Sequence, residues 1–507
     1  MPHYLIAHDL GTSGDKATLF TTDGTLVRSI TTAYDTHFFN STWAEQDPDI
    51  WWKAVCDGTH ALLEGIDRSM VAAMSFSGQM MGCVPVDKTG HALRPAMIWA
   101  DQRGQAQEKR LRERISETDF YHITGHRISA SYSLEKLMWI RDNEPEVFPS
   151  IFKMLQPKDY IIHRLTGSFV TDYSDASGTN CFDLRNLVWS EKILQAADID
   201  GSLLPDACPS THIAGEVYGA AADACGLPSG TPIVIGGGDG VCAAVGAGSV
   251  KTGDTFNYLG SSAWIAMTSD APVFDPEMRT YTWAHLIPGK YSPNGTMQAA
   301  GNSYQFMRRT ICRDLEAQAK ACGKSVYQLM NEEAAASPLG ANGLLYLPYL
   351  LGERSPRWNS EARGTLIGLK MEHTRGDILR ACIEGILMNL CIILDVLRTE
   401  TDIREINLIG GMAKGGIVQQ ILADLYGVRV HRLNWLDEAT SMGAAVAAGV
   451  GAGVLPDFTA IDRFVKTDVT VEPDQDNRRR YRELRQMFEE SYQALLETYH
   501  HLSSWNA

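Results

Sequence analysis

One aspartate set among glycines is the strongest candidate for acid–base chemistry in this chain. Asp239 lies in the run GGGDG at residues 236–240, after the apolar segment TPIVI and before a stretch of small residues. A carboxylate at such a bend can face a cleft, accept the proton of a hydroxyl group and orient its oxygen for attack on a phosphoryl group. The alternative is that Asp239 only caps the helix that follows.

A glycine turn near the start of the chain is suited to holding phosphates. Residues 9–16 read DLGTSGDK, and the glycines let the backbone approach phosphate oxygens while the hydroxyl, amide and ammonium groups donate hydrogen bonds. The residues expected to contact phosphate are Gly11, Thr12, Ser13 and Lys16. Asp9 is suited to orienting magnesium through water, because Mg²⁺ keeps several waters and takes only one or two carboxylates. Taken alone, the segment also fits an ordinary hairpin whose aspartate caps the turn.

The same phrase recurs in the second half of the chain. Residues 254–269 read DTFNYLGSSAWIAMTS, and Gly260, Ser261 and Ser262 take the place of the first turn. Two such hairpins could clamp one triphosphate across a cleft. A third glycine turn at residues 410–411 suits a wall for adenosine or a phosphate at a helix N-terminus, although it also fits ordinary packing at a helix start.

Two other glycine motifs resemble nucleotide-binding signatures but fail in detail. Gly323-Lys324-Ser325 echoes a P-loop, but Gln318 stands where that motif requires a glycine, and the flanking sequence is helical. In GGGDG, Val241 occupies the last glycine position of a dinucleotide-binding fingerprint. A P-loop enzyme and a dehydrogenase are therefore excluded.

These residues require a scaffold of two α/β domains. At 507 residues the chain is too long for one ordinary core. Strand and turn patterns predict an antiparallel meander over residues 4–29 and a second over 254–269. We predict a first domain at residues 1–245 and a second at 246–507. Helical spacing is strongest at residues 47–66, 133–148, 377–399, 412–426 and 476–500.

Composition and charge exclude several classes of protein. The formal net charge of −16 and the absence of a basic block disfavour nucleic acid as a partner. No run approaches the roughly 20 apolar residues that span a bilayer, so no membrane segment is expected. The ten cysteines are dispersed without a C-x-x-C pair, which indicates reduced thiols and a cytoplasmic protein. The sequence does not set the oligomeric state, and a homodimer is compatible with it.

With these elements in order, the chain resembles the FGGY family of carbohydrate kinases, and most of all its xylulokinase branch. Residues 131–143 resemble the family's first signature, built around Lys136 and Trp139. Residues 364–384 match the second signature, with Cys382 as the one departure. The phrases WAEQDPDIWW, QPKDY, TDYSDASGT and LLGERSP add to the likeness, which covers nearly the whole chain.

The resemblance implies two actin-like ATPase domains of the ribonuclease H type around a cleft, with ATP and Mg²⁺ and transfer to the terminal hydroxyl of a ketose or polyol. It implies that Asp239 is the general base and that Asp9 is the metal-associated carboxylate. The nucleotide-contacting residues that it implies are Gly11, Thr12, Ser13, Lys16, Gly260, Ser261, Gly301, Gln305, Gly411 and Gly415.

The residues expected at the sugar depart from the xylulokinase pattern at two positions. The string Gly78-Gln79-Met80-Met81 lacks the histidine that xylulokinases present after Met80, and Gly240 replaces an asparagine after the base. A site without such groups discriminates differently among hydroxyl patterns. A ketopentose such as xylulose is the expected sugar, and another pentulose, a deoxy sugar or a polyol is the alternative.

A tryptophan and a charged pair complete the expected sugar site. Trp99, Asp101 and Arg103 match a family W-x-D-x-R phrase, in which the ring would stack on the sugar and the charged pair would bind hydroxyls. The alternative is a surface ion pair beside a core tryptophan. Without the resemblance, Met80 and Met81 would be assigned to the core as gap-filling residues.

Two functions of other kinds stay open from the sequence. An ATP-driven conformational protein of the actin or chaperone kind would share the nucleotide fold but hydrolyse ATP with water, unaffected by sugar. A regulatory protein would bind sugar without phosphorylating it, although every catalytic position identified above is present.

Overall fold

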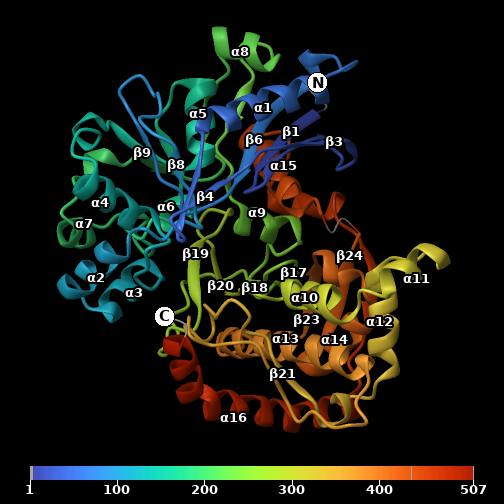
Figure 1. Ribbon diagram of the computed structural model, residues 1–507. Helices are drawn as coiled ribbons and strands as arrows, with labels where there is room; N and C mark the ends of the chain where they lie inside the picture. Colours follow the sequence, from blue (N-terminus) through green and yellow to red (C-terminus); the bar gives the residue numbers. More distant parts are fainter. Residues whose placement is uncertain (1–3, 435–436, 506–507) are drawn as a thin grey trace.

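Two seven-stranded sheets form the centre of the protein, one in each half of the chain (Figure 1). The computed structural model describes residues 4–434 and 437–505. The first sheet has the order β14-β15-β6-β1-β2-β3, with β16 also paired to β6. Its strands are β1 (Tyr4–Leu10), β2 (Gly14–Thr21), β3 (Leu26–Ala33), β6 (Val71–Gly78), β14 (Ile213–Glu216), β15 (Pro232–Val234) and β16 (Gly237–Gly238).

The second sheet has the order β19-β20-β18-β17-β23-β24-β25. Its strands are β17 (Thr255–Leu259), β18 (Ala263–Met267), β19 (Tyr281–Ala284), β20 (Tyr291–Met297), β23 (Glu405–Ile409), β24 (Arg429–Leu433) and β25 (Thr467–Val471).

The two sheets repeat one strand plan, as the recurring phrase predicts. In the first, β1, β2 and β3 form an antiparallel meander, and β6 runs parallel to β1, with β15 parallel to β6. In the second, β17, β18 and β20 form the meander, and β23 runs parallel to β17, with β24 parallel to β23. The β1–β2 and β17–β18 turns therefore occupy equivalent places.

Helices cover both sheets, and a helical extension lies beside the first. Around the first sheet lie α1 (Pro48–Leu62), α5 (Pro157–Thr166), α6 (Tyr173–Ser177) and α8 (Gly219–Cys225). The extension contains α2 (Gln105–Arg114), α3 (Glu117–Thr124), α4 (Ser133–Asn143) and α7 (Glu191–Ala197). The second sheet carries α10 (Gly301–Ile311), α11 (Leu315–Cys322), α12 (Val326–Ala336), α13 (Arg375–Leu397), α14 (Gly416–Tyr426) and α16 (Gln475–Trp505).

One predicted helix is interrupted. Residues 412–426 form a short 3₁₀ turn (Gly411–Lys414) and then α14, because Gly415 has extended backbone angles and serves as the N-cap of α14. By contrast, α13 and α16 lie where they were predicted. A capping box between Thr374 and Asp377 starts α13.

Two helices of small residues pass each other at the centre of the molecule. They are α9 (Asp239–Gly246) and α15 (Ala439–Gly451). The α15 helix packs on β1 and β6 of the first sheet, although along the chain it lies between β24 and β25 of the second. A Cβ atom at Gly443 would lie 2.0 Å from the carbonyl oxygen of Cys242, and one at Gly246 would lie 1.7 Å from that of Ala439. Glycine is therefore required at both points of contact.

Hydrophobic burial agrees with this architecture. All eight residues of β6 are buried, which is typical of a parallel strand covered on both faces. In α16 the buried residues Tyr481, Phe488, Tyr492 and Tyr499 follow helical spacing, so one face of this long helix covers the second half. Within the described residues, no helix is long and apolar enough to cross a membrane.

Candidate active site

Asp239 is the first residue of α9, directly after the edge where β16 pairs with the end of β6. Gly238 holds the N-cap position, so the alternative that Asp239 itself is the N-cap does not apply. Its Oδ1 accepts a hydrogen bond from the Gly240 amide at 2.7 Å. Burial, and then the negative charge of Asp9, raise the pKa of Asp239 to about 7. A carboxylate with this pKa exchanges protons readily near neutral pH.

Asp9 is the last residue but one of β1 and is held by hydroxyl groups from two other elements. Its Oδ1 accepts from Ser77 Oγ of β6 at 2.7 Å, and its Oδ2 accepts from Thr440 Oγ1 of α15 at 2.6 Å. Burial raises the pKa of Asp9, and the two hydroxyl contacts and Lys16 partly oppose this effect. The sequence did not reveal Ser77 or Thr440, because a single hydroxyl residue on a strand or helix carries no motif.

The β1–β2 turn lies beside the expected sugar-stacking ring. Thr12 Oγ1 accepts a hydrogen bond from Trp99 Nε1 at 2.8 Å, and the Thr12 carbonyl accepts from Gln46 Nε2 at 2.7 Å. The Gly11 amide donates to the Asp9 and Gly14 carbonyls at 3.0 Å each, which closes the turn. Lys16 donates to the main-chain carbonyl of Asp437, just before α15.

A cavity of about 390 Å³ lies in front of Asp239. Five of the residues expected at the sugar line it, namely Met80, Met81, Trp99, Asp239 and Gly240. The other lining residues come from the second half of the chain, and only Ser261 and Ser262 among them were expected from the sequence: Ser261, Ser262, Trp264, Ala266, Tyr281, Trp283, Ser292, Asn294, Thr296, Gln298, Asn302, Leu351 and Arg354.

The wall contributed by the second half is both polar and aromatic. Ser292, Asn294 and Thr296 alternate along β20 and therefore share one face of the strand, and Gln298 follows directly after it. Indole and phenol rings from β18 and β19 lie beside this row. Apart from the Asp239 carboxylate, the first half offers thioethers and one indole, so most hydroxyl-binding capacity in this cavity belongs to the second half.

A second cavity, of about 670 Å³, adjoins the first. It brings together the predicted residues Gly260, Ser261, Gly301, Gln305, Gly411 and Gly415. Ser261 and Asn302 line both cavities. Gly301 is sterically required, because a Cβ atom there would lie 2.3 Å from the Gly260 carbonyl oxygen, which also accepts the Gly301 amide at 2.9 Å.

The prediction that Asp101 and Arg103 contact the sugar directly is wrong. Neither lines the cavity, and both are buried. Arg103 Nη2 pairs with Asp101 at 2.7 Å and with Glu45 at 2.8 Å, and its guanidinium lies 3.8 Å from the ring centroid of Trp43. Because internal partners occupy both charges, their role is to hold the segment that carries Trp99. The alternative of a surface ion pair is also wrong, since the pair is buried.

Gln79 is likewise occupied inside the protein. It is buried and its Nε2 donates to Gln46 Oε1 at 2.8 Å, away from the lining of the cavity. Gln46 in turn binds the Thr12 carbonyl. Gln79 therefore connects the loop at residues 79–82 with the β1–β2 turn, and it does not line the cavity in which sugar contact was expected.

The signature lysine supports the loop that carries Met81. Met81 has a φ of 63°, an unusual value for a residue with a side chain. Lys136 is fully buried, and its Nζ donates to the carbonyl oxygens of Met81, Ile98 and Ser131 at 2.7, 2.7 and 2.6 Å. Burial lowers the pKa of Lys136 to about 8. This lysine is structural and fixes three backbone segments at one point.

The two halves of the chain share one strand plan. A titrating carboxylate lies in a polar cavity, and a larger cavity adjoins it. Together these features define a small-molecule phosphotransferase. Family models agree with this class. The N-terminal domain model of the FGGY family of carbohydrate kinases matches residues 4–246, and the C-terminal domain model matches residues 256–452. The chain belongs to the FGGY family of carbohydrate kinases, and it is a sugar kinase.

Individual relatives cover nearly the whole chain. A xylulose kinase of Staphylococcus epidermidis is 32% identical over 488 residues, which is 96% of this chain and 95% of the relative. A gluconokinase of Bacillus subtilis is 28% identical over 490 residues, with coverage of 96% and 95%.

Solved structures similar to this chain also include both a xylulose kinase and a gluconate kinase. Xylulose kinase from Lactobacillus acidophilus has a TM-score of 0.91 at 28% identity, and gluconate kinase from the same organism has 0.90 at 27%. Both cover 98% of this chain and 99% of their own. Similarity alone therefore does not select the sugar.

Proposed function

We propose that this sugar kinase transfers the γ-phosphoryl group of ATP to the terminal hydroxyl of a small sugar, with Asp239 as general base. The observation that carries the proposal is the position of Asp239 in a cavity that meets a second cavity at Ser261 and Asn302. A sugar in the first cavity and a nucleotide in the second would meet beside Asp239, which among the described residues is the one carboxylate that lines either cavity.

The reaction follows from this arrangement. Asp239 accepts the proton of the sugar hydroxyl as the oxygen attacks the γ-phosphorus, the bond to the β–γ bridging oxygen breaks, and ADP leaves. The turns at Gly11–Ser13 and Gly260–Ser261, with Lys16, bind the phosphates, while Gly301, Gln305, Gly411 and Gly415 surround the adenosine.

Magnesium fits the surroundings of Asp9. Each carboxylate oxygen of Asp9 accepts one hydroxyl hydrogen bond and keeps a lone pair, so the group can hold hydrated Mg²⁺ through water. When bound with ATP, the ion would neutralise charge that develops on the transferred phosphoryl group.

We propose a ketopentose such as xylulose as the sugar, following the names of the relatives. Met81 and Gly240 offer no hydrogen-bonding side chain, so hydroxyl recognition falls mainly to Asn294, Gln298 and Asn302 of the second half. Another pentulose, a deoxy sugar and a polyol are the alternatives. Gluconate belongs in the same comparison because of the gluconokinase relatives.

We further propose that the division lies near residue 245. The first half then carries the first phosphate turn and the base, and the second carries the nucleotide cavity. Because α15 returns to the first sheet, the chain crosses between the halves more than once.

The test is ADP release in the presence of a panel of ketoses, polyols and gluconate, with wild type and Asp239→Asn. We expect sugar-dependent turnover in wild type and a loss of about 10²- to 10⁴-fold in the variant. Asp223→Asn, an exposed change on α8, is the control and should behave as wild type. Undiminished sugar-dependent turnover in Asp239→Asn would remove Asp239 as base. ATP hydrolysis that no sugar stimulates would instead favour a conformational ATPase.

A further inference from the structure

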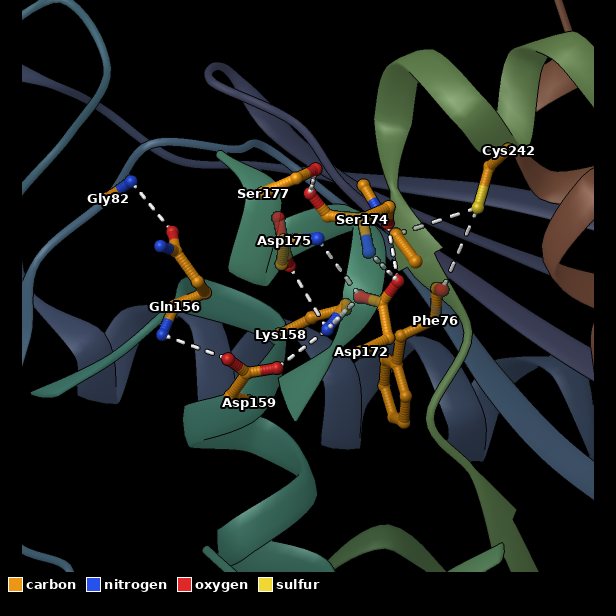
Figure 2. A network of polar contacts seen from close by, with 12 residues as sticks. Phe76, Gly82, Gln156, Lys158, Asp159, Asp172, Ser174, Asp175, Ser177 and Cys242 are labelled. Atoms are coloured by element: carbon orange, nitrogen blue, oxygen red, sulfur yellow. Dashed lines mark hydrogen bonds and ion pairs between the residues drawn. The ribbon is translucent and has the colours of Figure 1, made fainter. Parts of the chain in front are cut away.

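A fully buried cluster of charged side chains lies close to the backbone that precedes Asp239 (Figure 2). Lys158 and Asp159 stand in the first turn of α5, Asp172 is the N-cap of α6, and Asp175 lies in its first turn. The Lys158 Nζ atom lies 2.6, 2.9 and 3.0 Å from carboxylate oxygens of Asp159, Asp172 and Asp175. All four side chains are at most 1% exposed.

One arm of the cluster reaches the residue before the base. The second carboxylate oxygen of Asp172 accepts hydrogen bonds from the amide and the hydroxyl of Ser174 (Figure 2). Ser174 Oγ in turn accepts a hydrogen bond from the Gly238 amide at 2.9 Å. Gly238 immediately precedes Asp239. A Cβ atom at Gly237 would lie 2.9 Å from Ser174 Oγ, so the serine packs closely against this backbone.

The other arm reaches the residue after Met81. Asp159 Oδ2 accepts the Gln156 amide at 3.1 Å, and Gln156 Oε1 accepts the Gly82 amide at 2.8 Å (Figure 2). The lysine stem touches the same loop, because a Cβ atom at Gly78 would lie 3.1 Å from the Cβ of Lys158.

Stability alone is a poor explanation for this cluster. One ammonium group faces three carboxylates, and removing such charges from water costs more than imperfect pairing returns. Burial, together with Asp172 and Asp159, raises the pKa of Asp175 well above its usual range. What a buried network of this kind supplies is a single geometry.

We propose that the Lys158 cluster positions both loops that flank the acceptor hydroxyl: Ser174 sets the backbone that carries Asp239, and Gln156 sets the loop that carries Met81. The inference rests on the proposed function, in which Asp239 accepts the proton and Met81 borders the sugar. Lys158, Ser174 and Gln156 are thus positioning residues that act through the backbone.

The test separates the two arms by kinetics. With Mg-ATP and xylulose or gluconate, whichever turns over, Ser174→Ala should lower kcat about ten- to a hundred-fold and leave the sugar KM within about two-fold. Gln156→Leu should mainly raise the sugar KM. Ser174→Thr, which keeps the hydroxyl, should restore most of kcat. Ser249→Ala removes another buried hydroxyl, one that donates to the Asp254 carbonyl in the second half, and should match wild type.

Amide hydrogen exchange gives a readout that needs no substrate. Ser174→Ala should speed exchange in the peptide around Gly238, and Gln156→Leu in the peptide around Gly82, with exchange elsewhere unchanged. If Ser174→Ala does not fold, Ser174→Cys, with a weaker acceptor of similar size, takes its place.

Three results would overturn the proposal: wild-type kcat in a folded Ser174→Ala, equal effects of both variants on kcat and KM, or a folded Ser174→Thr that fails to restore kcat. An inactive Asp239→Asn beside a fully active Ser174→Ala would reject this inference alone, whereas an active Asp239→Asn would reject the proposed function.

Discussion

The protonation of a single residue, Asp239, should set the response of the enzyme to pH. Its pKa is raised to about 7, first by burial and then by Asp9, and only the ionised form accepts a proton. We expect kcat/KM for the sugar to rise with pH and to level off above about pH 7. Initial rates between pH 5 and pH 9 at saturating Mg-ATP measure this. A flat profile down to pH 5 would contradict the assignment of Asp239 as base.

The same pKa makes Asp239 unfavourable to folding in its active form. The folded state holds the proton of the Asp239 carboxyl group more tightly than the unfolded chain, where the pKa is near 3.8. The protonated carboxyl therefore stabilises the folded state fully below about pH 4, and this stabilisation is lost as pH rises through about 7. Asp239→Asn should therefore raise the thermal midpoint relative to wild type more at pH 8 than at pH 5. Thermal unfolding at the two values is the measurement, with Asp223→Asn as the control.

Gly240 is the position where sugar preference is most open to change. A Cβ atom there meets nothing within 4 Å, and the residue lines the sugar cavity, so an asparagine fits without disturbing the fold. Gly240→Asn supplies the amide that xylulokinases carry after the base. We expect kcat/KM for xylulose to rise relative to a deoxy sugar by about ten-fold, the effect of one hydrogen bond to a hydroxyl.

The measurement for Gly240→Asn is a pair of kcat/KM values on the two sugars. Gly238→Asn is the informative contrast, because a Cβ atom there would lie 2.5 Å from Met80 Sδ and should damage the site for every sugar. An unchanged preference in Gly240→Asn would show that Gly240 does not face the discriminating hydroxyl.

At the scale of elements, the parts that repeat or carry glycine turns were predictable. The β1–β2 and β17–β18 hairpins follow from LGTS and LGSS between apolar runs, because a tight turn between strands leaves a local signature. The four predicted glycines of the larger cavity also come together, since each is set by a local turn or a close backbone approach.

The wall of the sugar cavity could not be predicted in this way. Asn294 and Gln298 differ from ordinary half-buried residues only in what lies opposite them, and that is set by the pairing of β20 with β18 and by the placement of the two halves. Asp101 and Arg103 show the converse error. Their residue types suit hydroxyl binding, but Glu45 and Trp43, distant in sequence, occupy the pair.

Lys136 connects three elements, so its loss should affect more than one of them. Lys136→Met leaves the carbonyl oxygens of Met81, Ile98 and Ser131 without a donor, which should cost about 3 kcal/mol or more of the free energy of unfolding. The sugar KM should rise as well, because Met81 loses the contact that holds its positive φ.

Thermal unfolding and sugar kinetics of Lys136→Met check both effects. Lys192→Met is the control, since Lys192 pairs with Asp119 at the surface and should contribute less than about 1 kcal/mol. If Lys136→Met were as stable as wild type, water would have to satisfy the three carbonyl oxygens in place of the ammonium group, and the prediction would be wrong.

At the scale of the whole molecule, the two repeated halves share the chemistry unequally. Under the proposed function, the first half supplies both aspartates, and the second supplies the cavity for the nucleotide and most polar residues that line the cavity for the sugar. The α9 and α15 helices pack together between them, with Thr440 of α15 bonded to Asp9. Movement of one half toward the other would therefore change the distance between bound sugar, nucleotide and base at once.

This arrangement predicts that both ligands together close the cleft. Closure would exclude water from the transferring phosphoryl group and so suppress hydrolysis of ATP. Small-angle scattering should show a smaller radius of gyration with sugar and a non-hydrolysable ATP analogue together than with either alone. Asp239→Asn offers a matched case, because it should compact with sugar and ATP itself while turning over slowly. Equal radii in the free and doubly bound states would contradict closure, and water would then have to be excluded by the sugar filling its cavity.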